Sequence, residues 1–139
     1  CAGLQRLGLH ERIRERLTAP DWVPAVAQGA IAIECRDDDA TTQKLCAALE
    51  HAPTRICIEA ERAMNRRLHG SCQVPVAGYA ARDGDALHLQ GLVGDAANGE
   101  LVRAQAIGYS NDPLALGLRV AESLLAAGAD RLLARLSGH

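Results

Sequence analysis

Hydrophobic positions in the middle of the chain recur with a helical spacing. Between residues 54 and 68, one apolar residue occupies every fourth position: Ile56, Ala60, Met64 and Leu68. This repeat places the four side chains on one stripe of an α-helix, with charged residues opposite. The pattern predicts a helix packed on a core. Pro53 is expected to interrupt the preceding segment, and Thr54 to cap the new helix.

The second half of the chain changes to a strand-like pattern. Three runs predict β-strands, at residues 74–81, 86–93 and 101–109. Asp83-Gly84-Asp85 separates the first two, and Asp-Gly between such runs is typical of a β-hairpin. Asn111-Asp112-Pro113 then begins a helix that ends before Gly128. Its inward face is predicted as Leu114, Leu118, Ala121 and Leu125.

The N-terminal part combines short elements of different kinds. We predict a helix that ends near Gly8, an extended linker over 20–24 and an amphipathic helix over 40–50. Ala30–Cys35 is isoleucine-rich and almost free of charge, which is typical of a strand buried on both faces. A lone strand of this kind is expected to have its sheet partners upstream of Cys1.

Composition and charge narrow the classes of protein. The chain has 139 residues, 48% hydrophobic, 23% charged and with a net charge of -2, which predicts a globular protein without the basic field that attracts nucleic acid. No apolar run approaches the roughly 20 residues that cross a bilayer, so we expect no membrane span and a cytoplasmic location. Five cysteines, an odd number without close pairs, favour reduced thiols.

Three sequence blocks resemble the hydroxymethylbilane synthase (porphobilinogen deaminase) family. Residues 60–75, AERAMNRRLHGSCQVP, are similar to the stretch that ends in that family's cofactor cysteine. Residues 25–36, AVAQGAIAIECR, and 2–9, AGLQRLGL, resemble two further blocks in the family's order. Because the chain begins at Cys1 and its one methionine is Met64, we interpret it as a C-terminal fragment.

The resemblance implies an α+β fold divided among three domains. Residues 1–22 would end the second domain and 23–52 would return to the first, both of the α/β type found in periplasmic binding proteins. Residues 53–139 would form the C-terminal, cofactor-carrying domain, a three-stranded antiparallel sheet covered by helices.

The resemblance also implies the chemistry. The family joins four porphobilinogen molecules into hydroxymethylbilane, with loss of ammonia, on a covalently bound dipyrromethane cofactor. Cys72 matches the cysteine that carries it, since a thiolate is a strong nucleophile that forms a stable thioether. Arg6, Gly29 and Ala30 match residues that contact the cofactor. The catalytic aspartate belongs to the N-terminal half, so we expect no catalytic residue in this fragment, and a monomeric intact enzyme.

Several residues keep open roles. Ser71 stands beside Cys72 where the family has a second glycine. Cys35, Cys46 and Cys57 are interpreted as small buried residues, and their spacing predicts no metal site. Four arginines have two possible roles, since each could bind substrate carboxylates or could simply be solvated. They are Arg36, Arg62, Arg66 and Arg67.

Two other functions remain as alternatives. The first is a small regulatory module that binds a metabolite without chemistry, because a sheet backed by helices supports many functions. The second is a thiol redox protein, which needs a cysteine of low pKa and a resolving partner that the sequence does not reveal.

Overall fold

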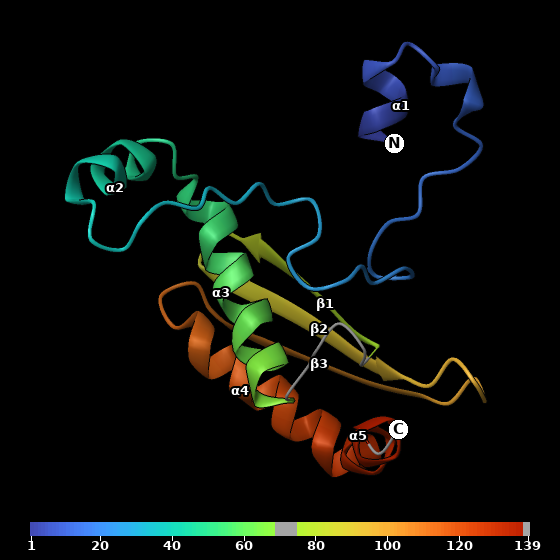
Figure 1. The fold of residues 1–139 in the computed structure, drawn as a ribbon. Coiled ribbons are helices and arrows are strands. Elements are labelled where there is room, and N and C mark those ends of the chain that lie inside the picture. The colour runs from blue at the N-terminus through green and yellow to red at the C-terminus, as the bar shows by residue number, and fades with distance from the viewer. Residues whose placement is uncertain (69–74, 138–139) are drawn as a thin grey trace.

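The computed structural model describes residues 1–68 and 75–137. Its centre is a three-stranded antiparallel sheet in the order β1-β2-β3, made of β1 (Val76–Asp83), β2 (Ala86–Gly94) and β3 (Leu101–Tyr109). Two long helices lie across one face of this sheet (Figure 1), α3 (Ala52–Arg67) and α4 (Pro113–Leu124). The α+β class predicted for the C-terminal part is therefore confirmed.

The hairpin between β1 and β2 has the predicted turn. Asp83 pairs with Ala86, which leaves Gly84 and Asp85 as a two-residue loop. Gly84 has φ of 58°, a conformation that glycine adopts without the steric cost of a side chain. Strand β3 then pairs antiparallel with β2 along the full length of both. Alternate residues therefore face either the helices or the open side of the sheet.

The core lies between the sheet and the two helices. Its largest fully buried side chains come from both layers: Met64, Leu68, Leu87, Leu89, Val93, Leu116, Val120, Leu124 and Leu132. Met64 lies over Gly78 and Gly91, where an added Cβ would collide with its side chain. At Gly117 the helices α3 and α4 approach so closely that a Cβ would lie 2.6 Å from the Cβ of Ala63.

The inward face of α4 differs from the predicted one. Leu116, Val120 and Leu124 are buried, whereas Leu114 and Leu118 are 50% and 48% exposed. The segment is apolar on almost every side, so the periodicity alone did not select a face. The helix begins after Asp112, whose carboxylate accepts a hydrogen bond from the backbone N–H of Ala115 at 3.2 Å.

The chain bends after α4 and then continues in one more helix. The five-residue π-type turn η2 (Leu125–Ala129) contains Gly128 at φ 106°, which produces the bend predicted at this glycine. The last helix is α5 (Asp130–Ser137), and Leu132 is its buried contribution to the core.

Helix α3 begins earlier than predicted. It starts at Ala52, and Pro53 lies within its first turn, where the missing N–H of a proline has no intrahelical partner to lose. Thr54 is therefore not the N-cap. Its hydroxyl instead lies 2.8 Å from His51 Nδ1, and His51 occupies the capping position.

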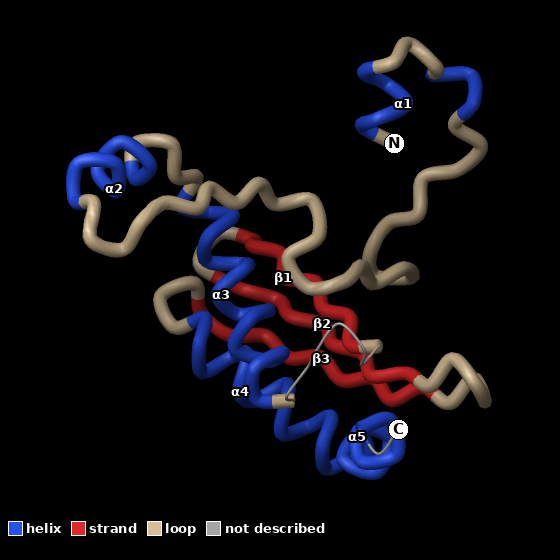
Figure 2. Tube along the Cα trace, in the orientation of Figure 1, coloured by secondary structure: helices blue, strands red, loops and turns tan. Residues whose placement is uncertain are grey.

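The N-terminal region carries only short helices: α1 (Ala2–Arg6), the 3-10 turn η1 (His10–Arg12) and α2 (Ala40–Ala47). Figure 2 shows α1 and α2 standing apart from the sheet on long connecting segments. The strand predicted over Ala30–Cys35 does not form, because no other strand lies beside it among the described residues. A strand needs such a neighbour to satisfy its backbone groups.

One stretch of this region does join the sheet. Ala25 forms an antiparallel bridge with Ala77, and the N–H of Gly78 donates to Pro24 O at 3.0 Å. Residues 24–25 thereby extend the free edge of β1. Val26 follows and packs against the core.

Candidate functional site

The predicted cofactor cysteine, Cys72, lies outside the described residues, so its attachment role stays a prediction. The same holds for its neighbour Ser71. The described elements on either side are α3, which ends at Arg67, and β1, which starts at Val76.

Gly29 and Ala30 lie in a turn against the edge of the C-terminal domain. The turn is closed by two hydrogen bonds, from Gln28 N–H to Ala25 O at 3.0 Å and from Ala30 N–H to Ala27 O at 3.2 Å. Gly29 has φ of 86° and no heavy atom within 4 Å of the place a Cβ would take. The backbone there is consequently open to a neighbouring group.

This turn borders a cavity of about 510 Å³, which we call the turn pocket. Its walls come from the turn, from the first half of α3 and from β1: Pro24, Ala25, Gln28, Gly29, Ala30, Pro53, Thr54, Cys57, Ile58, Glu61, Tyr79, Ala80, Ala81 and Arg82. Two predicted site residues, Gly29 and Ala30, are therefore brought together with α3, the helix that precedes Cys72 in the chain.

Glu61 is a residue of this pocket that the sequence did not single out for a site. It is 5% exposed and is the one buried charged residue among residues 1–68 and 75–137. Oε2 accepts the N–H of Ala27 at 2.8 Å, and Oε1 accepts the N–H of Ala80 at 2.8 Å. Burial raises the pKa of the Glu61 carboxyl, while these two hydrogen bonds lower it by less. In the sequence, the feature that could have indicated a buried Glu61 is its place directly after Ala60, a residue of the apolar stripe.

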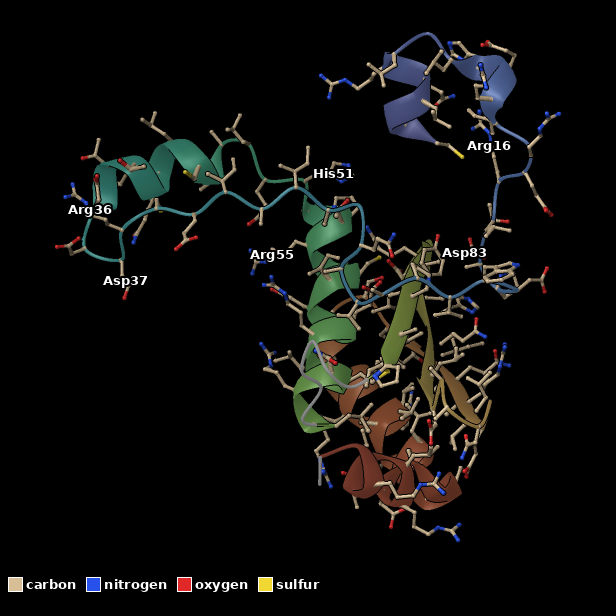
Figure 3. The ribbon with its side chains drawn as sticks, turned by 45° about the vertical axis from the view of Figure 1, so that its right-hand side comes forward. Arg16, Arg36, Asp37, His51, Arg55 and Asp83 are labelled. Atoms are coloured by element: carbon tan, nitrogen blue, oxygen red, sulfur yellow. The ribbon has the colours of Figure 1, made fainter. Side chains whose placement is uncertain are left out.

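Arg6 is not brought to the turn pocket. It is an exposed residue at the end of α1, which lies apart from the sheet (Figure 1). Arg36 is also remote, since Figure 3 shows it with Asp37 at the turn before α2. Its guanidinium lies 3.7 Å from Asp39.

The arginines of α3 point to solvent. Arg62, Arg66 and Arg67 are exposed, and Arg67 forms an ion pair with Glu122 of α4 at 2.7 Å. Figure 3 shows Arg55 near the beginning of the same helix, where it bonds Glu59 at 2.7 Å. Exposed pairs of this kind contribute little to stability.

The turn pocket fits a dipyrromethane only in part. Such a cofactor carries acetate and propionate groups, which arginines bind well. The arginine in the pocket wall, Arg82, already donates to Ser110 Oγ at 3.0 Å and to Gly84 O at 3.1 Å, and the Glu61 carboxylate repels anions. The open backbone at Gly29 leaves room for a pyrrole ring, but the described residues of this pocket supply no cluster of free cations.

A second cavity lies on the face of the sheet that the helices leave open. It has a volume of about 640 Å³, and Ala19 and Pro20 close one side of it. Its floor includes Tyr79, His88 and Gln90. None of the predicted site residues lines it.

Two of the described cysteines have a thiol pKa above the ordinary value. Burial raises the pKa of Cys57, and burial together with the neighbouring Cys35 thiol raises the pKa of Cys46. A raised pKa keeps these thiols protonated and weakly nucleophilic.

Within residues 1–68 and 75–137, no three acidic, histidine or cysteine side chains gather closely enough to hold a metal ion. No helix in the same ranges is long and apolar enough to cross a membrane.

Family models match both parts of the chain. Residues 55–126, more than half of the 139-residue chain, match the model described as "Porphobilinogen deaminase, C-terminal domain". Residues 1–44 match "Porphobilinogen deaminase, dipyromethane cofactor binding domain".

Individual relatives agree with these matches. The porphobilinogen deaminase of Xanthomonas axonopodis pv. citri is 59% identical over 136 residues, which are 98% of this chain and 45% of the relative. That of Stenotrophomonas maltophilia strain K279a is 61% identical over 132 residues, 95% of this chain and 44% of the relative. The chain thus spans somewhat less than half the length of these relatives.

The helix-covered antiparallel sheet, with the segment around Ala25 joined to its edge strand, defines a small α+β domain. Both family models occur in order along the chain and together cover most of it. The chain belongs to the porphobilinogen deaminase family.

Proposed function

We propose that this chain is the C-terminal part of a complete porphobilinogen deaminase, also called hydroxymethylbilane synthase, which acts in tetrapyrrole biosynthesis. The enzyme would join four porphobilinogen molecules head to tail, with loss of ammonia, into hydroxymethylbilane. The observation that carries the proposal is 59% identity to a named porphobilinogen deaminase across 98% of the chain. The remaining half of such a protein would supply the catalytic aspartate and most of the arginines.

Cys72 would be the attachment point. As porphobilinogen loses ammonia, its methylene carbon becomes electrophilic, and the Cys72 sulfur forms a C–S bond to that carbon while the thiol proton is released. The dipyrromethane built in this way anchors the growing chain. Supporting this role, Cys72 ends the AERAMNRRLHGSC block, five residues after the last residue of α3, the helix that lines the turn pocket.

The other predicted residues would contact the cofactor through different groups. Gly29 and Ala30 offer a backbone without bulky side chains, and Gly29 faces open space. Arg6 would bind a carboxylate, which requires the region around α1 to approach the turn in the complete protein. We further propose that the domains divide near residues 22 and 52, and that the intact enzyme is a cytoplasmic monomer.

Mass spectrometry of the denatured full-length enzyme tests the attachment site. We expect two pyrrole units on Cys72 in the wild type, and none in Cys72→Ser. Cys46→Ser is the matched control, since Cys46 lies in α2, outside the wall of the turn pocket, and has a raised pKa, and it should load normally. An active full-length enzyme with an unmodified Cys72 would refute the proposal.

Cys46 and Cys57 do not support the redox alternative, because the pKa values of both thiols are raised and not lowered. The metabolite-binding alternative has one observation in its favour, the cavity of about 640 Å³ on the open face of the sheet. It predicts that residues 53–139 bind a small molecule without any covalent pyrrole.

A further inference from the structure

The buried carboxylate of Glu61 needs a structural explanation. An ionised carboxylate is poorly tolerated away from water unless hydrogen-bond donors replace its hydration. At 5% exposure, Glu61 receives that compensation from two main-chain N–H groups, each at 2.8 Å. A neutral apolar residue would pack in the same place without the cost of desolvation, but it would leave the two N–H groups without this acceptor.

The two donors belong to different segments of the chain. Ala80 lies in the edge strand β1, 19 residues after Glu61, and Ala27 lies in the turn segment, 34 residues before it. Ala27 has φ of 61°, which residues other than glycine adopt only rarely. One carboxylate therefore fastens α3, β1 and the turn together, and it holds the turn segment in a backbone conformation that is not the most favourable one.

The fastened turn is the one that carries Gly29 and Ala30. Both residues border the turn pocket with Glu61, and the N–H of Ala30 bonds to Ala27 O, next to the N–H that Glu61 holds. On the other side, Glu61 belongs to the helix that leads in sequence to Cys72. Glu61 thus bonds directly to the turn segment and precedes Cys72 by eleven residues in the sequence.

We propose that Glu61 is a positioning residue, which holds the Gln28-Gly29-Ala30 turn against the domain that carries Cys72. This inference rests on the function proposed above, because it assumes that the turn contacts the pyrrole group on Cys72. Both hydrogen bonds of Glu61 to described residues involve main-chain amides, so its proposed role is exerted through the turn.

Hydrogen exchange in the full-length enzyme tests the contact directly. Glu61→Ala removes both acceptors, and the isosteric Glu61→Gln keeps one acceptor and turns an amide N–H₂ toward the other donor. We expect the N–H groups of Ala27 and Ala80 to exchange about tenfold faster or more in Glu61→Ala, and at least one of them to do so in Glu61→Gln. Glu59→Gln is the control, because Glu59 bonds only the exposed Arg55 in the described contacts. Unchanged exchange at both amides would overturn the proposal.

Cofactor loading tests the consequence. Apoenzyme of each variant is incubated with porphobilinogen, and the mass of the protein is followed with time. We expect Glu61→Gln to acquire its pyrroles at least about tenfold more slowly than the wild type and Glu59→Gln do. The melting temperature of Glu61→Gln should at the same time show that the variant is folded. Faster exchange with a normal rate of loading would reject the positioning role. An unmodified Cys72 in the wild type would instead refute the proposed function itself.

Discussion

Glu61 shows how burial and hydrogen bonding act in opposite directions on one carboxyl group. Loss of water favours the neutral acid, and the amides of Ala27 and Ala80 favour the anion. Because burial is the larger effect, the pKa of Glu61 in the folded protein lies above its ordinary value. The folded protein therefore binds this proton more tightly than the unfolded chain does.

A pH-dependent stability follows from that difference. The stabilisation linked to protonated Glu61 is complete below the pKa of an unfolded glutamate, about 4.3, and is lost as the pH rises through the higher folded pKa. Glu61→Gln cannot titrate. We expect the free energy of unfolding of the wild type, minus that of Glu61→Gln, to fall as the pH is raised above about 4. Urea unfolding of the full-length proteins across this range measures it, and a constant difference would contradict the prediction.

Sequence patterns were unequally informative about single residues. Cys72 was assigned because a long block around it matches a family, not because of its own surroundings. Glu61 was missed because its partners are main-chain amides 34 and 19 residues away, and those groups have no signature in the sequence. Only the fold brings the three residues together.

At the scale of elements, the crossing of α3 and α4 depends on a missing side chain. A Cβ at Gly117 would overlap the carbonyl oxygen of Ala60 and lie 2.9 Å from the backbone N of Met64. These are backbone atoms, which cannot rotate away. We expect Gly117→Ala to lower the free energy of unfolding by about 1–3 kcal/mol through overpacking.

Gly94→Ala is the matched control for this substitution. The nearest atom to its added Cβ would be Leu101 Cδ2 at 3.4 Å, an ordinary contact, so the effect should be much smaller. Chemical denaturation of both variants gives the comparison. Equal losses of stability would show that the close approach of the two helices is not the cause.

The start of α4 depends on its capping side chain. Asp112 accepts the N–H of Ala115 at 3.2 Å, which satisfies a donor that the helix itself leaves free. We expect Asp112→Ala to cost about 0.5–2 kcal/mol of stability and Asp112→Asn to cost less, because an asparagine oxygen also caps. Thermal unfolding of the two variants measures this, and an equal cost would argue against the cap.

Helix existence was easier to predict than helix orientation. The apolar stripe of α3 was correct, because charged residues on its other side leave one choice. In α4 leucines occur on both sides, and the buried set lies where the glycines of the sheet leave room, with Leu116 over Gly108 and Leu124 beside Met64 over Gly91. That information resides in the sheet and not in the helix.

At the scale of the molecule, the N-terminal region exposes residues that normally belong to a core. The most exposed of these side chains are Leu7, Leu17, Trp22, Ile31, Ile33, Leu45 and Leu49, with Ile31 exposed to 94%. The strand predicted over 30–35 does not form in this region either, because no other strand lies beside it among the described residues. We propose that its hydrogen-bonding partners lie in the part of the relatives' length that this chain does not span.

We therefore expect the 139-residue chain alone to self-associate. Exposed apolar residues, and a backbone over 31–35 that pairs with no strand among the described residues, favour contacts between copies. Analytical ultracentrifugation should show species larger than a monomer, and fewer of them after Ile31→Ser. A monodisperse monomer at high concentration would contradict this expectation.

The hydrogen bonds of Glu61 also predict an asymmetry in how these positions tolerate substitution. Both donors are backbone groups that almost every amino acid possesses, so positions 27 and 80 can change residue type without removing an N–H, proline excepted. Position 61 has no such freedom. Sequence variation among natural relatives should thus be restricted at one end of this contact and relaxed at the other, which would make the contact hard to detect by looking for residue pairs that change together.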